Sequence, residues 1–150
     1  MPQPNNRPEA EPAGGFRPTV LIVDDYPENC RLLYFYLRSD YEVLTAASGE
    51  EALQLVDQHP VDLVVMDINL KDGMNGIEAT QQLRQRGGMQ TIPVIAISAY
   101  AYPDDRARFL EAGFDDYIPK PIFKERMLRK VRSLLGASEE AVWISPPRSI

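Results

Sequence analysis

Short apolar runs alternate with longer amphipathic segments along most of the chain, at a repeat of about twenty residues. The apolar runs have the length and β-branched content of buried strands and lie at 19–23, 42–46, 62–66, 93–98 and 116–118. Each run is followed by a helical pattern: a helix opened by Pro27, then helices at 48–58, 76–86, 104–112 and 122–135. Ser48 and Glu51 have the spacing of a capping box, and Gly113 is placed to end the fourth helix.

Five strand–helix units in series predict a parallel α/β sheet with helices on both faces, because strands this apolar cannot face water. Two doubly wound strand orders are common for such sheets. The first strand–helix turn, Val23-Asp24-Asp25-Tyr26, contains no glycine, and its paired carboxylates would repel a pyrophosphate. A dinucleotide site is therefore excluded, and we predict the flavodoxin-like order 2-1-3-4-5.

The 150 residues suffice for one domain and are too few for two ordinary ones. Residues 1–17 are rich in Pro, Asn, Gly and Glu and predict a disordered lead-in, and the domain is expected to span 18–136. Residues 137–150, which include Pro146-Pro147, are typical of a C-terminal tail. No output domain fits after residue 136, so we expect a protein that acts alone, one that passes a chemical group onward, or a piece of a larger protein.

Charge and hydropathy narrow the classes of partner. The net charge of −6 disfavours nucleic acid, and the basic stretch 124–132 alternates with apolar residues, as on the solvated face of a last helix. No apolar stretch approaches a membrane span, and the N-terminus lacks a signal-peptide pattern, so we expect no membrane contact and a cytoplasmic location. Cys30, the only cysteine, is expected to be a small buried hydrophobic residue.

Polar residues of complementary chemistry stand at the ends of four strands. Asp24 and Asp25 follow the first strand, Asp67 the third, Ser98 the fourth and Lys120 the fifth. The carboxyl ends of parallel strands share one edge of a sheet, so these side chains are expected to meet there. Taken singly, an Asp pair is more often a helix-capping turn and a lysine a surface residue. Their joint occurrence at four strand ends favours a shared functional site over these structural roles.

Three converging carboxylates need a cation to stay ionised, and an all-oxygen site fits Mg²⁺. We expect Asp25 and Asp67 to be direct ligands, Asp24 to hold a metal-bound water, and the backbone carbonyl of Asn69 to complete the set. An aspartate is also a known phosphoryl nucleophile, which points to Asp67. Lys120 and the hydroxyl of Ser98 would then accommodate the phosphoryl oxygens that the metal does not take.

These residues resemble the response-regulator receiver domains of two-component signalling. The order Asp24-Asp25, Asp67, Ser98 and Lys120-Pro121 is that of the family, with gaps of 42, 31 and 22 residues counted from Asp25. The resemblance covers about residues 18–136 and is carried by four motifs: Leu-Ile-Val-Asp-Asp (21–25), Met-Asp-Ile-Asn-Leu (66–70), Ala-Gly-Phe-Asp-Asp-Tyr (112–117) and Pro-Lys-Pro (119–121).

The resemblance implies a CheY-like fold and a phosphoryl group transferred to Asp67 from a histidine kinase or a histidine phosphotransfer protein, with Mg²⁺ required. It also implies a cis peptide bond between Lys120 and Pro121. Ser98 would move toward the phosphoryl group and Tyr117 would swing inward as the switch residue. The face made by the fourth helix, the fifth strand and the fifth helix would then be read by a downstream protein. The chain would be a monomer or a phosphorylation-dependent dimer.

Two features depart from the family pattern. The loop 68–76 is one residue longer than usual and lacks the usual proline near Lys71, which leaves its shape open. Tyr100 is bulky at a position beside the path of an attacking water. We expect Tyr100→Ala to hasten hydrolysis of the aspartyl phosphate, measured as its decay rate; an unchanged rate would contradict this.

Two other readings are open. A haloacid-dehalogenase-type phosphatase also forms an aspartyl phosphate at a strand end, but such enzymes need an acid two residues after the nucleophile, where this chain has Asn69. A receiver-like module that is never phosphorylated would lack one of the core residues, and none is missing. The preferred hypothesis is a phosphoacceptor signalling domain that catalyses only its own phosphorylation and dephosphorylation.

Overall fold

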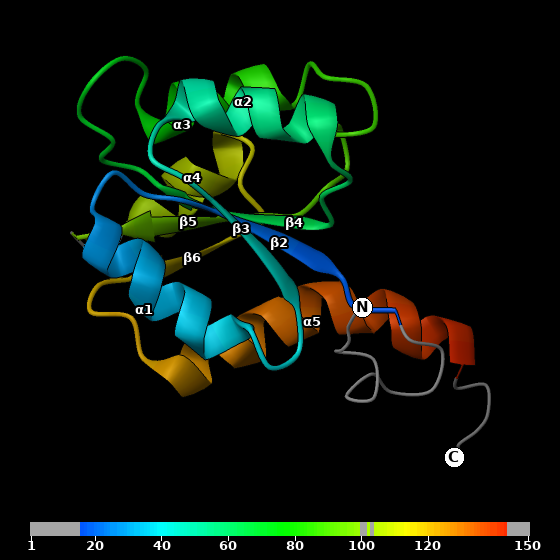
Figure 1. The fold of residues 1–150 in the computed structure, drawn as a ribbon. Coiled ribbons are helices and arrows are strands. Elements are labelled where there is room, and N and C mark those ends of the chain that lie inside the picture. Colours follow the sequence, from blue (N-terminus) through cyan, green and yellow to red (C-terminus); the bar gives the residue numbers. More distant parts are fainter. Residues whose placement is uncertain (1–15, 100–101, 103, 144–150) are drawn as a thin grey trace.

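The computed structural model describes residues 16–99, 102 and 104–143, with only the backbone described from 137 onward. One parallel sheet lies between two layers of helices (Figure 1) and consists of β2 (Thr19–Val23), β3 (Glu42–Ala46), β4 (Leu63–Asp67), β5 (Val94–Ser98) and β6 (Asp116–Pro119). The strands lie in the spatial order β3-β2-β4-β5-β6, and every pairing is parallel. The predicted order 2-1-3-4-5 is confirmed.

Helices cover both faces of the sheet, as predicted (Figure 1). On one face lie α1 (Pro27–Leu37) and α5 (Lys124–Trp143), and on the other lie α2 (Gly49–Gln58), α3 (Gly76–Leu83) and α4 (Asp105–Glu111). Alternate strand residues feed the two cores: Val20 and Ile22 pack toward α1 and α5, whereas Leu21 and Val23 pack on the opposite side. Both faces of β4 and β5 are buried, which explains why these strands are apolar throughout.

The helix starts follow the sequence signals closely but not completely. Pro27 lies in the first turn of α1, and the Ser48 hydroxyl accepts a hydrogen bond from the amide of Glu51 at 3.1 Å. The Glu51 carboxylate, however, accepts from the amide of Ala47, one residue before the predicted partner. A reciprocal capping box does form at α3, between Asn75 and Glu78.

The last helix is longer than predicted. It continues to Trp143, so its expected end at residue 135 is wrong, and 137–143 are helical rather than an irregular tail. Gly136 weakens a helix interior by only about 1 kcal/mol, and the following Ala-Ser-Glu-Glu-Ala segment contains good helix formers. The rest of the predicted tail, 144–150, and most of the predicted lead-in, 1–17, lie outside the described residues. Within the described part of the chain, no helix combines the length and hydropathy needed to cross a membrane.

Candidate functional site

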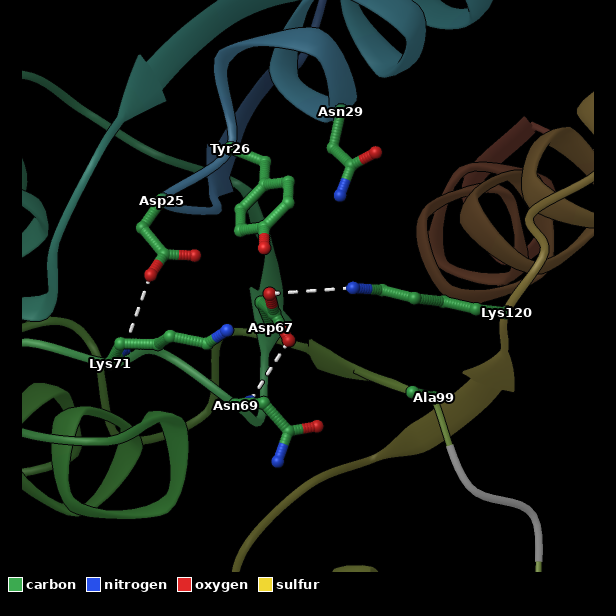
Figure 2. Close-up of a pocket in the computed structure, with 8 residues that line it drawn as sticks. All are labelled: Asp25, Tyr26, Asn29, Asp67, Asn69, Lys71, Ala99 and Lys120. Carbon is green, nitrogen blue, oxygen red and sulfur yellow. Dashed lines mark hydrogen bonds and ion pairs between the residues drawn. The ribbon is translucent and has the colours of Figure 1, made fainter.

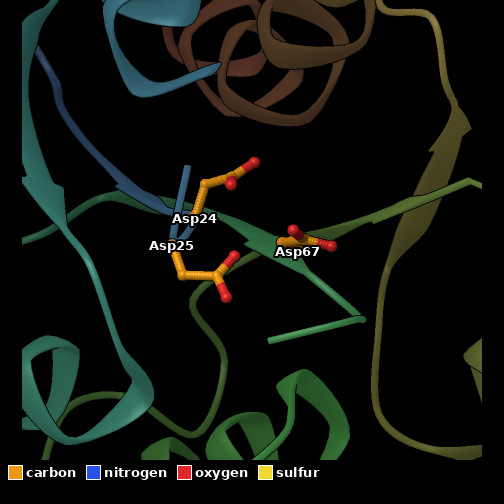
Figure 3. Close-up of side chains that lie close together, drawn as sticks. All are labelled: Asp24, Asp25 and Asp67. Carbon is orange, nitrogen blue, oxygen red and sulfur yellow. The ribbon is translucent and has the colours of Figure 1, made fainter. Parts of the chain in front are cut away.

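Three carboxylates meet at the carboxyl edge of the sheet, as the sequence predicted. Asp24 and Asp25 follow β2 and Asp67 ends β4, and one oxygen from each lies within 4.8 Å of the others (Figure 3). Asp24 and Asp67 are buried, with exposed fractions of 2% and 3%, and Asp25 is half-buried. Such proximity is unfavourable without a counter-charge.

The backbone after β2 holds Asp24 in one orientation. Its carboxylate accepts hydrogen bonds from the amide of Tyr26 at 2.9 Å and from the side-chain amide of Asn29 at 3.1 Å. Burial raises the pKa of Asp24, and the nearby charge of Asp67 adds to this effect; the two hydrogen bonds and Lys120 act in the opposite direction without cancelling it. A bound cation would favour the charged form of this carboxylate.

Lys120 joins the ends of β5 and β6 to the carboxylates. Its ammonium lies 3.6 Å from Oδ2 of Asp67, and its amide donates to the carbonyl of Ser98 at 2.8 Å. Ser98, the last residue of β5, is 4% exposed. The Lys120–Pro121 peptide bond is cis, which confirms the expectation. All four predicted strand ends therefore meet at one edge of the sheet.

The loop after β4 orients the Asp67 carboxylate. The amide of Asn69 donates to Oδ1 of Asp67 at 2.9 Å, while Oδ2 faces Lys120. The end of the loop lies against its start, because the amide of Gly76 donates to the carbonyl of Ile68 at 3.1 Å. A β-carbon on Gly76 would lie 2.2 Å from the carbonyl oxygen of Asp67, so only glycine allows this close approach.

Asp25 and Asp67 open onto a cleft of about 340 Å³ (Figure 2). Its lining residues are Asp25, Tyr26, Asn29, Asp67, Asn69, Lys71, Ala99 and Lys120. Four of these, Tyr26, Asn29, Lys71 and Ala99, were not among the predicted site residues. Each lies one to four residues from a predicted one, and that proximity was the available signal. What the sequence does not specify is which loop side chains turn inward.

The predicted switch residue, Tyr117, lies half-buried on β6. Its ring packs against Phe109 of α4, with centroids 5.4 Å apart and a tilt of 55°. Next to it, Asp116 forms ion pairs with Arg106 of α4 and Lys130 of α5, at 3.2 and 3.0 Å. Burial acts to raise the pKa of Asp116, but the hydrogen bond from Lys130 and the adjacent positive charges lower it overall. This carboxylate thus links both helices of the predicted output face. Tyr100 lies outside the described residues.

Cys30 lies on α1, half-buried, and its thiol donates to the carbonyl of Asp24 at 3.3 Å. Burial, with a contribution from the charge of Asp24, raises the pKa of the thiol to about 11. At pH 8 we expect alkylation by iodoacetamide to be slower than for an exposed cysteine by on the order of 100-fold, because the thiolate is the reactive form. Equal labelling rates of the native and the urea-unfolded chain would contradict this prediction.

The family model described as "Response regulator receiver domain" matches residues 20–132. The chain is 38% identical over 119 residues to the polar-differentiation response regulator DivK of Brucella abortus, a match of 79% of this chain and 96% of DivK. It is 36% identical over 129 residues to the transcriptional regulatory protein KdpE of Mycobacterium tuberculosis, covering 85% of this chain but only about half of KdpE, 55%.

Solved structures of receiver domains and related response regulators also match this chain. The chemotaxis protein CheY4 of Vibrio cholerae superposes with a TM-score of 0.76 at 26% identity, covering 80% of this chain and all of CheY4. The receiver domain of the sensor histidine kinase PA1611 of Pseudomonas aeruginosa superposes with a TM-score of 0.73 at 30% identity, covering 81% and 99% of the two chains. That structure is described as having a magnesium ion coordinated in its active-site cleft.

The chain belongs to the response regulator receiver domains, the phosphorylation-dependent signalling modules of two-component systems. The predicted family and the CheY-like, flavodoxin-like fold are thereby confirmed. Nothing in these matches supports the haloacid-dehalogenase-type phosphatase that the sequence left as an alternative.

Proposed function

We propose that Asp67 accepts a phosphoryl group from a phosphohistidine of a histidine kinase or a histidine phosphotransfer protein. The observation that carries this proposal is the placement of the Asp67 carboxylate, which is buried at the end of β4 between two further carboxylates and the ammonium of Lys120. A structural aspartate would gain nothing from two like charges within 4.8 Å.

The transfer uses one carboxylate oxygen of Asp67 as the nucleophile. That oxygen forms a new bond to phosphorus while the P–N bond of the phosphohistidine breaks, and the bonding electrons leave with the imidazole, which takes up a proton. The product is an acyl phosphate on Asp67. Oδ2 faces Lys120 and Oδ1 is held by the amide of Asn69, so the carboxylate is presented in a fixed orientation.

The donor set fits Mg²⁺, since it consists only of oxygen atoms and three of them belong to carboxylates. Asp25 and Asp67 would hold the ion directly, Asp24 through a water, and Asn69 through its backbone carbonyl. When bound, the ion would neutralise the carboxylates and take part of the phosphoryl charge. Lys120 and the hydroxyl of Ser98 would serve the remaining phosphoryl oxygens.

Signalling would proceed through the face formed by α4, β6 and α5. In the phosphorylated chain Ser98 would move toward the phosphoryl group, and the Tyr117 ring, which now packs against Phe109, would move into the vacated space. The change is a population shift between two packings, driven by contacts made only in the phosphorylated form. A downstream protein then binds this face.

The partners follow from the same proposal. A histidine kinase or phosphotransfer protein supplies the phosphoryl group in the cytoplasm, and the target is a protein rather than a nucleic acid, given the net charge of −6. DivK and KdpE are named as a polar-differentiation regulator and a transcriptional regulator, two different outputs for related receivers. The chain would act as a monomer or as a dimer formed on phosphorylation.

Intact-mass measurement of the chain after incubation with acetyl phosphate tests this function. With Mg²⁺ we expect the mass to increase by one phosphoryl group, and fragmentation to place that group on the peptide containing Asp67. Chelation of the metal by EDTA should suppress the reaction. A chain that gains no mass, or that carries the group on another residue, would contradict the proposal.

A further inference from the structure

Lys71 brings a second ammonium group to the cleft. It stands in the loop between β4 and α3, and its amide donates to Oδ2 of Asp25 at 3.2 Å. Its Nζ lies 5.4 Å from the centroid of the Tyr26 ring, within cation–π range. Figure 2 shows this ammonium directed into the cleft, on the side of Asp67 away from Lys120. The two lysines therefore flank the reactive carboxylate.

The backbone that carries Lys71 is anchored at several points. Beyond it, the amide of Met74 donates to the Glu50 carboxylate at 3.3 Å, and the Met74 side chain packs on Gly49 at the start of α2. The loop closes through the hydrogen bond from Gly76 to Ile68. Lys71 thus projects from a held backbone, and its ammonium lies over the Tyr26 ring.

We propose that Lys71, positioned by Tyr26, is a binding residue for dianionic phosphoryl donors, an inference that rests on the proposed phosphorylation of Asp67. The three clustered carboxylates, a divalent cation and the two ammonium groups of the cleft would give the site a formal charge of +1. Without Lys71 the same site would be neutral. A positive cleft draws in a dianion and favours its docking beside Asp67.

The positive charge of Lys71 that favours donor binding disfavours metal binding. An ammonium in the same cleft as Asp25 and Asp67 repels a divalent cation, so Lys71 would weaken metal binding while it strengthens donor binding. This opposition separates an electrostatic role from a structural one. Loss of a residue with a structural role would weaken the binding of both the metal and the donor.

Lys71→Met tests the proposal, because it keeps the length of the side chain and removes its charge. We expect phosphorylation by acetyl phosphate, a dianion, to slow about three- to ten-fold at low ionic strength. Phosphoramidate carries one negative charge fewer and should slow less. Lys71→Arg should retain the wild-type rate. Tyr26→Leu, which removes the ring but leaves the charge, should give an intermediate rate.

Calorimetric titration with Mg²⁺ alone supplies a readout independent of phosphorylation. Lys71→Met should bind Mg²⁺ about two- to five-fold more tightly than the wild type. Lys124→Met is the matched control: it removes the same charge from the exposed start of α5, and it should change neither quantity.

Two results would overturn the inference: a Lys71→Met variant with wild-type rates and metal affinity, or one in which both decline together. In either case a phosphorylated wild type would leave the proposed function of Asp67 standing. A wild-type chain that takes no phosphoryl group from either donor would instead remove the proposed function, and this inference with it.

Discussion

Asp67→Asn is expected to abolish phosphorylation, leaving a chain whose mass does not change on incubation with Mg²⁺ and acetyl phosphate. The amide retains the shape of the side chain and can still accept from the amide of Asn69, but it lacks the anionic oxygen that attacks phosphorus. Asp24 and Asp25 lie in the same cluster, and fragmentation of the product would show whether either takes the group in place of Asp67. Intact-mass spectrometry measures the result directly.

Asp72→Asn is the matched control, since it makes the same substitution at an exposed position of the same loop. It should be phosphorylated at the wild-type rate. Thermal unfolding gives a second comparison: added Mg²⁺ should raise the Tm of the wild type and of Asp72→Asn, and raise that of Asp67→Asn less, because a ligand is lost. Phosphorylation of Asp67→Asn at a comparable level would show that another group is the acceptor.

The strand ends could be predicted from sequence because two independent regularities coincide there. The apolar runs fix where each strand stops, and parallel topology fixes that all stops share one edge. Topology alone therefore predicts that five side chains lie close together: Asp24, Asp25, Asp67, Ser98 and Lys120. The structure adds the 3.6 Å contact between Lys120 and Asp67 and the burial of that carboxylate.

The side chains that the loops place in the cleft could not be predicted from strand ends and topology. Lys71 reaches the cleft because its loop backbone is held by Asp25 and Glu50, two contacts between segments far apart in the sequence. No local pattern encodes such contacts. The predicted end of α5 was wrong for another reason: Pro146-Pro147 marked 137–150 as a tail, whereas the helix-forming residues after Gly136 carry the helix to Trp143.

The site and the proposed output face meet at two adjacent strands, β5 and β6. Ser98 ends β5, and Lys120 directly follows β6, the strand that carries Tyr117. In the β5–β6 register, Ala96 pairs with Tyr117 and Ser98 pairs with Pro119, so the switch residue lies two positions from the cleft on the neighbouring strand. A displacement of Ser98 therefore needs to travel only one strand spacing to alter the packing of Tyr117 on Phe109.

Gly76→Ala is expected to lower the free energy of unfolding by about 1–3 kcal/mol, the range typical of overpacking against a rigid neighbour. The added β-carbon would lie 2.2 Å from the carbonyl oxygen of Asp67 and 2.8 Å from the α-carbon of Ile68, both backbone atoms. Neither can yield without moving the end of β4. Urea unfolding followed by circular dichroism measures the change, and phosphorylation of the folded fraction should also slow.

Gly87→Ala provides the control for this prediction, because a β-carbon there meets nothing within 4 Å. Its free energy of unfolding should stay within about 0.5 kcal/mol of the wild-type value, as is usual at exposed positions. The comparison separates the loss of glycine flexibility, common to both variants, from the clash specific to Gly76. If Gly76→Ala proved as stable as Gly87→Ala, the loop 68–76 could not be held against Asp67 as closely as the structure places it, and the fixed orientation of that carboxylate would lose its physical basis.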